Sequence, residues 1–189
     1  VARETIRAIG YTRPEDGFDA DPVEIQCRIH TQSPDIALGT NDAVGGAGDQ
    51  GMMFGGACTQ TPELMPLPAA LSRALCNRLT ECVKENDLLR PDGKTQVSVE
   101  FDETGNVEGI ETVVVSIMHS EDFAMEDLRA YIRDRVIAPV LERYGFDIRQ
   151  VPHIYINPTG NFVVGGPNGD TGLTGRKIIV DTYGGYFSH

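Results

Sequence analysis

The sequence predicts an α+β protein in which a βαββαβ unit packs its helices on one face of a mixed sheet, beside part of a second, similar unit. The main observation is the order of hydrophobic patterns in the middle of the chain, which reads strand, helix, strand, strand, helix, strand. Helical and strand-like patterns also lie before and after that stretch. A chain of 189 residues is long enough to bury the core of one good-sized domain.

Residues 1–50 are predicted to form part of the second unit. A helical pattern over 2–9 ends at Gly10, and apolar residues alternate with polar ones over 23–29, which predicts a strand. From Gln32 to Gly51 we find no periodicity, so we expect a loop. A loop of that length in a compact domain is usually functional or disordered.

Residues 51–160 are predicted to hold the complete βαββαβ unit. Its elements are expected at 51–58, 66–86, 97–101, 113–117, 125–142 and 153–156. In the first helix, Leu71, Leu75 and Leu79 recur at every fourth position and form one apolar stripe. Gly105, in DETGN, supplies the turn between two alternating stretches, which predicts a β-hairpin.

Residues 161–189 are predicted to return to the second unit and to carry a nucleotide-binding loop. Strands are expected at 162–164 and 177–183, and we expect these to pair with the strand at 23–29. The first unit would then interrupt the second one in the sequence. Because the chain starts within a helical pattern and stops just after an apolar strand, we expect it to be a fragment of a longer protein.

Composition and charge exclude several classes of protein. The net charge of −12, from 28 acidic and 16 basic residues, gives no broad electrostatic surface for nucleic acid or for an anionic membrane. Any bound phosphate must therefore be held by a local cluster of basic residues. The four cysteines have neither C-x-x-C nor zinc-site spacing, so we expect reduced thiols in a cytoplasmic protein. No apolar run has the length of a membrane span.

The stretch GGAGDQGMMFGG, residues 45–56, is half glycine and contains one acid, Asp49. Its spacing fits G-x-G-x-x-G, the dinucleotide fingerprint, but that motif needs a strand before it and a helix after it. The polar stretch upstream and the glycines downstream supply neither. On this segment alone, a glycine-rich turn that leads into the strand at 51–58 is the better interpretation.

Two further glycine-flanked loops present an acid together with bases. RPDGKTQ contains Asp92 and Lys94, and the stretch 157–185 contains Asp170 followed by Arg176 and Lys177. Each loop by itself could be a turn with solvated charges. Three loops with such similar residues favour a common site for an anionic ligand.

The motifs together resemble the S-adenosylmethionine synthetases, or methionine adenosyltransferases. The resemblance rests on QSPDI, GAGDQGMMFG, LRPDGKTQV and INPTGNFVVGGPNGDTGLTGRKIIVDTYGG, which occur in the family's order over essentially the whole chain. It implies that methionine sulfur attacks C5′ of ATP and displaces the triphosphate, which is then hydrolysed to phosphate and pyrophosphate. It also implies a fold of three βαββαβ units about a pseudo-threefold axis, in a homodimer or homotetramer with shared active sites.

The resemblance assigns roles to individual residues. Lys94, Arg176 and Lys177 would be catalytic, because basic side chains can stabilise the charge that gathers on the leaving triphosphate. The ATP-binding residues implied are Asp49, Asp92, Gly93, Lys94, Asn161, Phe162, Asp170, Arg176 and Lys177. The methionine-binding residues implied are Gln32, Asp49 and Asp170. Residues 32–42 would form a mobile loop that gates the site, and Asp49 would reach the substrates at a dimer interface.

The chain departs from the family pattern at several points. Asn161 stands where the family usually has arginine, in G-R-F, and Gly56 and Gln60 are unusual after MMFG. The family's His-Pro-Asp-Lys motif and its glycine-rich segment with further lysines and a metal-binding aspartate are expected outside these 189 residues. The cofactors implied are Mg²⁺ and K⁺, and we expect no metal ligand in this chain. The four histidines, His30, His119, His153 and His189, are not assigned the family's catalytic role.

The expected partners are ATP, L-methionine and further copies of the chain, with no nucleic acid and no membrane. The alternative is a non-catalytic ATP-binding or oligomerisation module that retains the substrate loops without the chemistry.

Overall fold

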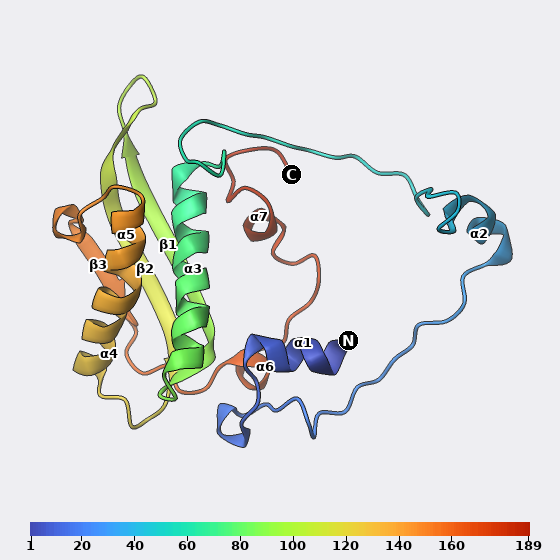
Figure 1. Ribbon diagram of the computed structural model, residues 1–189, viewed down its shortest axis with the longest axis horizontal. Coiled ribbons are helices and arrows are strands. Elements are labelled where there is room, and N and C mark those ends of the chain that lie inside the picture. Colours follow the sequence, from blue (N-terminus) through green and yellow to red (C-terminus); the bar gives the residue numbers. More distant parts are fainter.

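The computed structural model describes all 189 residues, and its hydrophobic core lies between Leu67 and Ile156 (Figure 1). The core elements are α3 (Leu67–Glu85), β1 (Leu89–Phe101), β2 (Val107–His119), α4 (Met125–Ile132), α5 (Ala138–Arg143) and β3 (His153–Ile156). The sheet has the order β1-β2-β3, with β1 antiparallel and β3 parallel to β2. The prediction of an α+β fold with a mixed sheet is confirmed.

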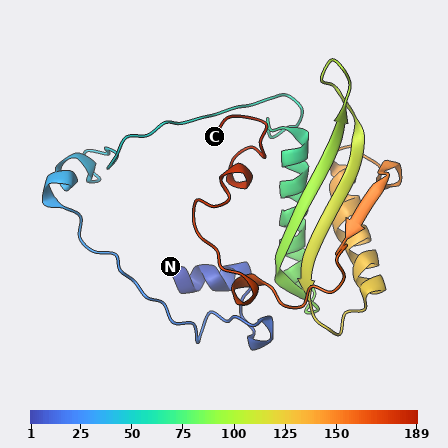
Figure 2. The ribbon, with the colours of Figure 1, turned by 180° about the vertical axis from the view of Figure 1, so that it is seen from behind.

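The helices α3, α4 and α5 cover one face of the sheet, while its other face carries no helix (Figures 1 and 2). Buried and partly exposed residues alternate along β2, which explains this arrangement. Val113, Val115 and Ile117 are buried beneath the helices, and the residues between them are partly exposed. Leu71 and Leu75 of α3 are fully buried against them. Burial of each such side chain stabilises the fold by roughly 1.5–3 kcal/mol.

The second predicted helix, 125–142, forms as a continuous helical segment with one irregular turn. A π-helical turn, η2 (Arg133–Ile137), joins α4 to α5. Pro139 has no N–H with which to bond the carbonyl of Arg135, and Arg78 Nε of α3 donates to that carbonyl instead, at 2.9 Å. The proline therefore frees a carbonyl that ties the two helices together.

The predicted hairpin is confirmed, and its turn is fixed by side-chain hydrogen bonds. Gly105 has φ +86°, a left-handed conformation that favours glycine. The carboxylate of Asp102 accepts hydrogen bonds from Asn106 and Thr104, which lower its pKa to about 2.

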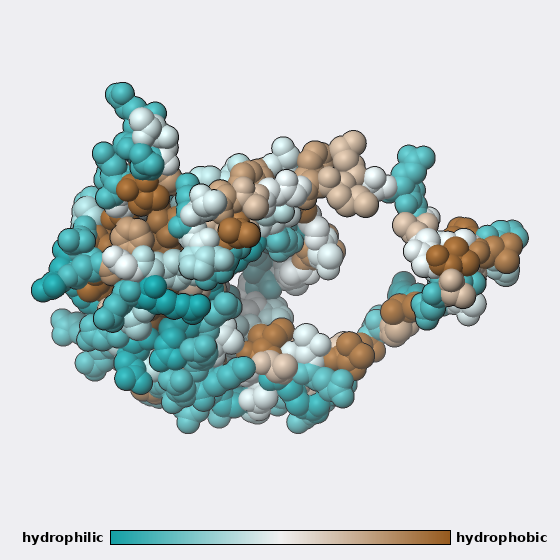
Figure 3. Space-filling model, turned by 45° about the horizontal axis from the view of Figure 1, so that its top comes forward, coloured by the Kyte–Doolittle hydropathy of each residue, from teal (hydrophilic) through white to brown (hydrophobic).

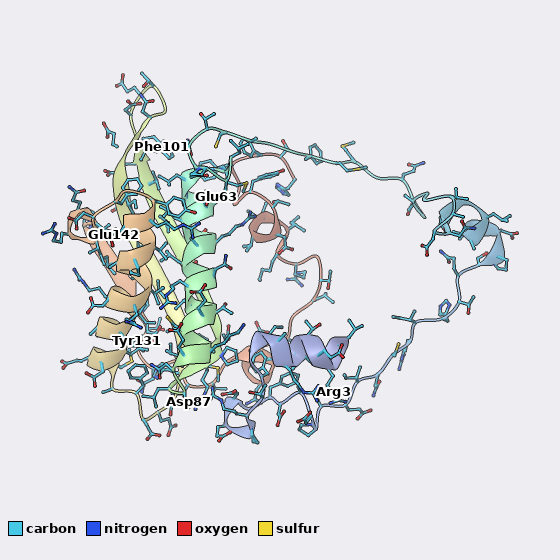
Figure 4. All side chains as sticks on the ribbon, in the orientation of Figure 1. Arg3, Glu63, Asp87, Phe101, Tyr131 and Glu142 are labelled. Atoms are coloured by element: carbon cyan, nitrogen blue, oxygen red, sulfur yellow. The ribbon has the colours of Figure 1, made fainter.

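The first twenty residues form a helix and a compact loop next to the start of β1. Helix α1 (Ala2–Ile9) ends at Gly10, as predicted, and is followed by the short 3-10 helix η1 (Pro14–Asp16). Arg3 of α1 donates to the carbonyls of Ala20, Asp21 and Val23. Helix α1 lies near the turn between α3 and β1, because Ile9 lines one groove with Val83 and Arg90. Figure 4 labels Arg3 and Asp87 along that side of the molecule.

Residues 22–57 make a wide excursion from the rest of the chain (Figure 1). The loop predicted from Gln32 onward contains one helix, α2 (Pro34–Thr40), so the prediction was wrong there. Proline at the first position of a helix is pre-organised for it, and Pro34 takes that position. Figure 3 shows hydrophobic residues on the surface around α2, where Leu38 is 76% exposed.

Four predicted strands, at 23–29, 51–58, 162–164 and 177–183, are absent. Strands form only where another strand supplies backbone hydrogen bonds, and these segments are not paired with one another or with the sheet. The last one contains a short helix instead, α7 (Ile178–Asp181). The proposed second unit, and the boundaries at 50 and 160, stay predictions.

The remaining short elements are η3 (Ile148–Gln150) and α6 (Gly166–Gly169). All four cysteines are free. None of the helices has both the length and the hydropathy to cross a membrane.

Candidate functional site

Six of the residues that the sequence predicts for the site line a single cavity of about 1100 Å³. They are Asp92, Lys94, Phe162, Asp170, Arg176 and Lys177. The first two come from β1, and the others come from the segment that follows β3. The cavity thus brings together two of the three glycine-flanked loops.

The segment RPDGKTQ belongs to β1, so the prediction of a turn there was wrong. The pairing of β1 with β2 is irregular in this segment, with a shift in strand register between Leu89 and Gly93. Lys94 then pairs with Ser116 of β2. Because Lys94 is paired within the sheet, its backbone is held more firmly than a turn would hold it, whereas Asp92 lies within the register shift.

Asp92 joins β1 to the second glycine-rich loop. Its Oδ2 accepts a hydrogen bond from the backbone N–H of Gly166 at 2.7 Å. The approach requires glycine, because a Cβ atom at Gly165 would lie 2.7 Å from the same Oδ2. Gly166 has φ +58° and faces the hydroxyl of Tyr11. These two glycines therefore allow three chain segments to meet at the cavity.

Tyr11 is largely buried and lines the cavity. Burial, with the nearby charges of Asp92 and Asp16, raises the pKa of Tyr11 to about 12. The phenol therefore stays neutral at physiological pH.

Asp16 is a fully buried carboxylate that connects the first loop to β1. Its Oδ2 lies 3.3 Å from Arg13 Nε, and its Oδ1 lies 2.9 Å from Arg90 Nε. The contact with Arg90 is an ion pair without a well-aligned hydrogen bond, since Oδ1 has no hydrogen-bond donor. Arg13 also donates to the carbonyl of Leu89. Asp16 thus neutralises two guanidinium groups at the start of the strand that carries Asp92.

We expect Asp16→Ala to lower the free energy of unfolding by about 3–5 kcal/mol, because it leaves the largely buried Arg90 without its anion and leaves Arg13 with only the exposed Asp87. Asp21→Ala is the matched control: its pair with Arg7 is exposed, and such pairs contribute about 0–1 kcal/mol. Urea unfolding of the two variants measures the difference. Equal shifts would show that the buried pair contributes no more than a surface one.

Lys94, Arg176 and Lys177 have no anionic partner in the structure. All three are exposed, and none forms an ion pair or a side-chain hydrogen bond. Arg13 and Arg78, by contrast, each pair with acidic side chains. Three unpaired cations on one cavity of a protein with a net charge of −12 make a local site for an anion.

Four predicted residues lie outside this cavity. Gln32 and Asp49 lie on the excursion formed by residues 22–57, away from the cavity. Asn161 lines a neighbouring cavity of about 150 Å³ together with Lys94 and Phe162. Gly93 lines a separate, half-apolar groove of about 420 Å³, and its lack of a side chain lets Ile117 of β2 approach.

The carboxylates of this chain do not form a metal site. No three His, Cys, Asp or Glu side chains are grouped so that they could hold a metal ion. Neither Asp49 nor Asp181 lines the cavity of Asp92 and Asp170. Because Mg²⁺ is usually held by one or two carboxylates together with substrate phosphates and water, side chains of this chain would supply at most part of its coordination shell.

Four residues that shape the site were not predicted from the sequence: Tyr11, Asp16, Arg90 and His119. Arg90 lies within the quoted motif LRPDGKTQV, which could have drawn attention to it. Asp16 in PEDGFD has the sequence context of an ordinary exposed turn, and nothing local indicates its burial.

Comparisons with known proteins agree on one family. Residues 44–162 match the family model "S-adenosylmethionine synthetase, central domain", and residues 164–189 match "S-adenosylmethionine synthetase, C-terminal domain". The chain is 51% identical, over 191 aligned positions, to the S-adenosylmethionine synthase of Fusobacterium nucleatum subsp. nucleatum. The alignment covers 100% of this chain and 49% of that relative, so the chain spans about half of the relative's length.

Proposed function

Because the chain belongs to the S-adenosylmethionine synthetase family, we propose that it forms part of the active site of a methionine adenosyltransferase. The reaction joins ATP and L-methionine to S-adenosylmethionine and releases phosphate and pyrophosphate. The observation that carries the proposal is the set of three unpaired cations, Lys94, Arg176 and Lys177, on one cavity. A triphosphate leaving group is the part of the reaction that needs them.

The chemistry matches these residue types. A thioether sulfur is already nucleophilic, so the reaction needs alignment of sulfur with C5′ more than it needs a general base. Negative charge gathers on the leaving triphosphate in the transition state, where positioned cations stabilise it. Arg176 can bind two phosphate oxygens at once, whereas Lys94 and Lys177 act as point charges.

The other site residues are proposed to hold the substrates. Asp92 and Phe162 would line the nucleotide site, with Gly93 and Asn161 beside them, and Asp170 would bind the methionine ammonium group. Gln32 and Asp49 would reach the substrates from the excursion formed by residues 22–57. Since these two lie away from the cavity here, their role requires either a movement of that segment or a neighbouring copy of the chain.

The assembly and location follow from the same proposal. A homodimer or homotetramer would let Asp49 of one copy serve the cavity of another. The proposed location is the cytoplasm, where ATP and methionine are found and where free cysteines stay reduced. Neither nucleic acid nor a membrane is a proposed partner, given the net charge of −12.

Divalent and monovalent cations, Mg²⁺ and K⁺, would support the reaction by neutralising phosphate charge. Since the carboxylates of this chain form no metal site, their ligands are proposed to lie in other parts of the complete protein. The role proposed for Lys94, Arg176 and Lys177 does not depend on these ions.

The function is tested by incubating the complete protein with ATP and labelled methionine. The proposal expects labelled S-adenosylmethionine in amounts equal to the ATP consumed. ATP binding without product would instead support the alternative, a non-catalytic ATP-binding or oligomerisation module.

We expect residues 32–42, which include the exposed helix α2, to be held firmly in place only when substrate binds. The segment is exposed and has few apolar contacts, so little holds it in place in the free protein. Hydrogen exchange of these amides should be fast in the free protein and slower with ATP and methionine. Equal exchange in both states would contradict the gating role, and the amides of α3 serve as the internal control.

A further inference from the structure

His119, at the end of β2, is a buried side chain whose two ring nitrogens both contact backbone groups. It is 1% exposed. The N–H of Phe162 donates to Nε2 at 3.1 Å, and Nδ1 lies 2.8 Å from the carbonyl oxygen of Ser120. The backbone N–H of His119 also donates to the carbonyl of Phe162 at 2.9 Å. His119 therefore binds both the N–H and the C=O of one residue of the candidate nucleotide site.

These partners define the tautomer of the ring. A backbone N–H can only donate and a carbonyl can only accept, so Nε2 is the acceptor and the proton resides on Nδ1. Both nitrogens are engaged, which leaves the neutral ring no free group with which to exchange a proton with a substrate. The geometry excludes a general acid or base role in this arrangement and favours a positioning role.

A second buried side chain, Asn157, holds the other end of the same loop. Its Oδ1 accepts from the N–H of Ile117 at 2.9 Å, and its Nδ2 donates to the carbonyl of Ile117 at 3.0 Å. The side-chain amide thus continues the ladder between β2 and β3 beyond the point where β3 ends, at Ile156. Asn157 has φ +43°, and this turns the backbone away from the sheet.

The loop between these two attachments contributes to the predicted nucleotide site. Residues 158–161 are fixed at one end by Asn157 and lead directly to Phe162 at the other. Asn157, Asn161 and Phe162 line a cavity of about 150 Å³ with Lys94 and Ser116. Phe162 also lines the large cavity with Arg176 and Lys177. A displacement of Phe162 would therefore change the shape of both cavities.

We propose that His119 is a positioning residue for nucleotide binding, which fixes the peptide of Phe162 and so the wall of the ATP site. The inference rests on the proposed function of this cavity and adds a residue to it. The essential contact is the hydrogen bond from the N–H of Phe162 to Nε2, since it is the only hydrogen bond of the His119 ring to the loop.

Two variants of the complete protein separate the hydrogen bond between Phe162 and Nε2 from the one between Nδ1 and Ser120. His119→Gln places an amide oxygen near the position of Nε2, where it can still accept from Phe162. His119→Asn places its amide near Nδ1, where it can serve only the carbonyl of Ser120. Each variant loses one of two buried hydrogen bonds, so a merely structural role predicts similar effects in both.

We expect KM for ATP to rise about tenfold in His119→Asn, which corresponds to about 1.4 kcal/mol, and to stay within about threefold of the wild type in His119→Gln. KM for methionine should change little in either variant. Hydrogen exchange of the Phe162 amide, which does not depend on activity, should be faster in His119→Asn alone.

Equal effects of the two variants on KM for ATP would overturn the proposal, as would an exchange difference without a difference in KM. A wild-type protein that forms no S-adenosylmethionine would overturn the proposed function. In that case the exchange contrast would still show whether His119 holds Phe162, so the two failures can be told apart.

Discussion

Replacing Arg176 with alanine in the complete protein is expected to lower turnover by about 10²–10³-fold, the usual cost of removing one donor that stabilises transition-state charge. Lys177→Ala is expected to act in the same direction. Because neither side chain has an anionic partner in the structure, the empty fold loses little when either is removed. The melting temperature should therefore stay near that of the wild type.

Two further variants control this result. Lys84→Ala removes an exposed charge of α3 that does not line the cavity, and it should leave turnover unchanged. Arg176→Lys keeps the charge but loses the bidentate geometry, so its turnover should be intermediate. A large drop in melting temperature with turnover preserved would show that Arg176 and Lys177 are structural residues.

Residues 1–189, purified alone, are expected to form no measurable S-adenosylmethionine. Lys94, Arg176 and Lys177 supply three positive charges, whereas enzymes that act on nucleoside triphosphates normally add divalent cations to neutralise the charge on the phosphates. The carboxylates of this chain form no metal site, and the chain spans about half of the relative that it matches. Any remaining binding of ATP should be weak and sensitive to salt.

The measurement compares this chain with a protein of the relative's full length, using labelled methionine, ATP, Mg²⁺ and K⁺. Turnover by residues 1–189 within about tenfold of the longer protein would be a barrier difference of only about 1.4 kcal/mol. That result would contradict the expectation and would require metal ligands among Asp49, Asp92, Asp170 and Asp181.

Local sequence patterns predicted the elements whose stability comes from near neighbours in the chain. The leucine stripe of α3 and the alternation on either side of Gly105 each define an apolar face, and both elements form where expected. The strands predicted from the alternation at 23–29 and from the apolar run at 177–183 are absent, because a strand also needs a partner from elsewhere in the fold. The residue pattern of a segment does not show whether a partner strand lies beside it in the folded protein.

In the site, too, residues within local motifs could be predicted, whereas residues that act through distant partners could not. The glycine-flanked motifs indicated a common site, and six of the predicted residues, including Asp92 and Arg176, do line one cavity. Asp16 and His119 could not be found in this way, because their importance comes from burial and from partners 43 to 74 residues away. The residues next to them in the sequence do not indicate this burial or these partners. The roles of the site residues in binding and catalysis stay predictions.

The proposed function depends above all on Lys94, Arg176 and Lys177 binding the triphosphate of ATP together. The most direct measurement is a crystal structure of the complete protein with a non-hydrolysable imidotriphosphate analogue of ATP. We expect phosphate oxygens within hydrogen-bond distance of all three side chains and the nucleoside next to Phe162. An analogue bound elsewhere, with these three side chains in contact only with solvent or with carboxylates of the protein, would contradict the proposal.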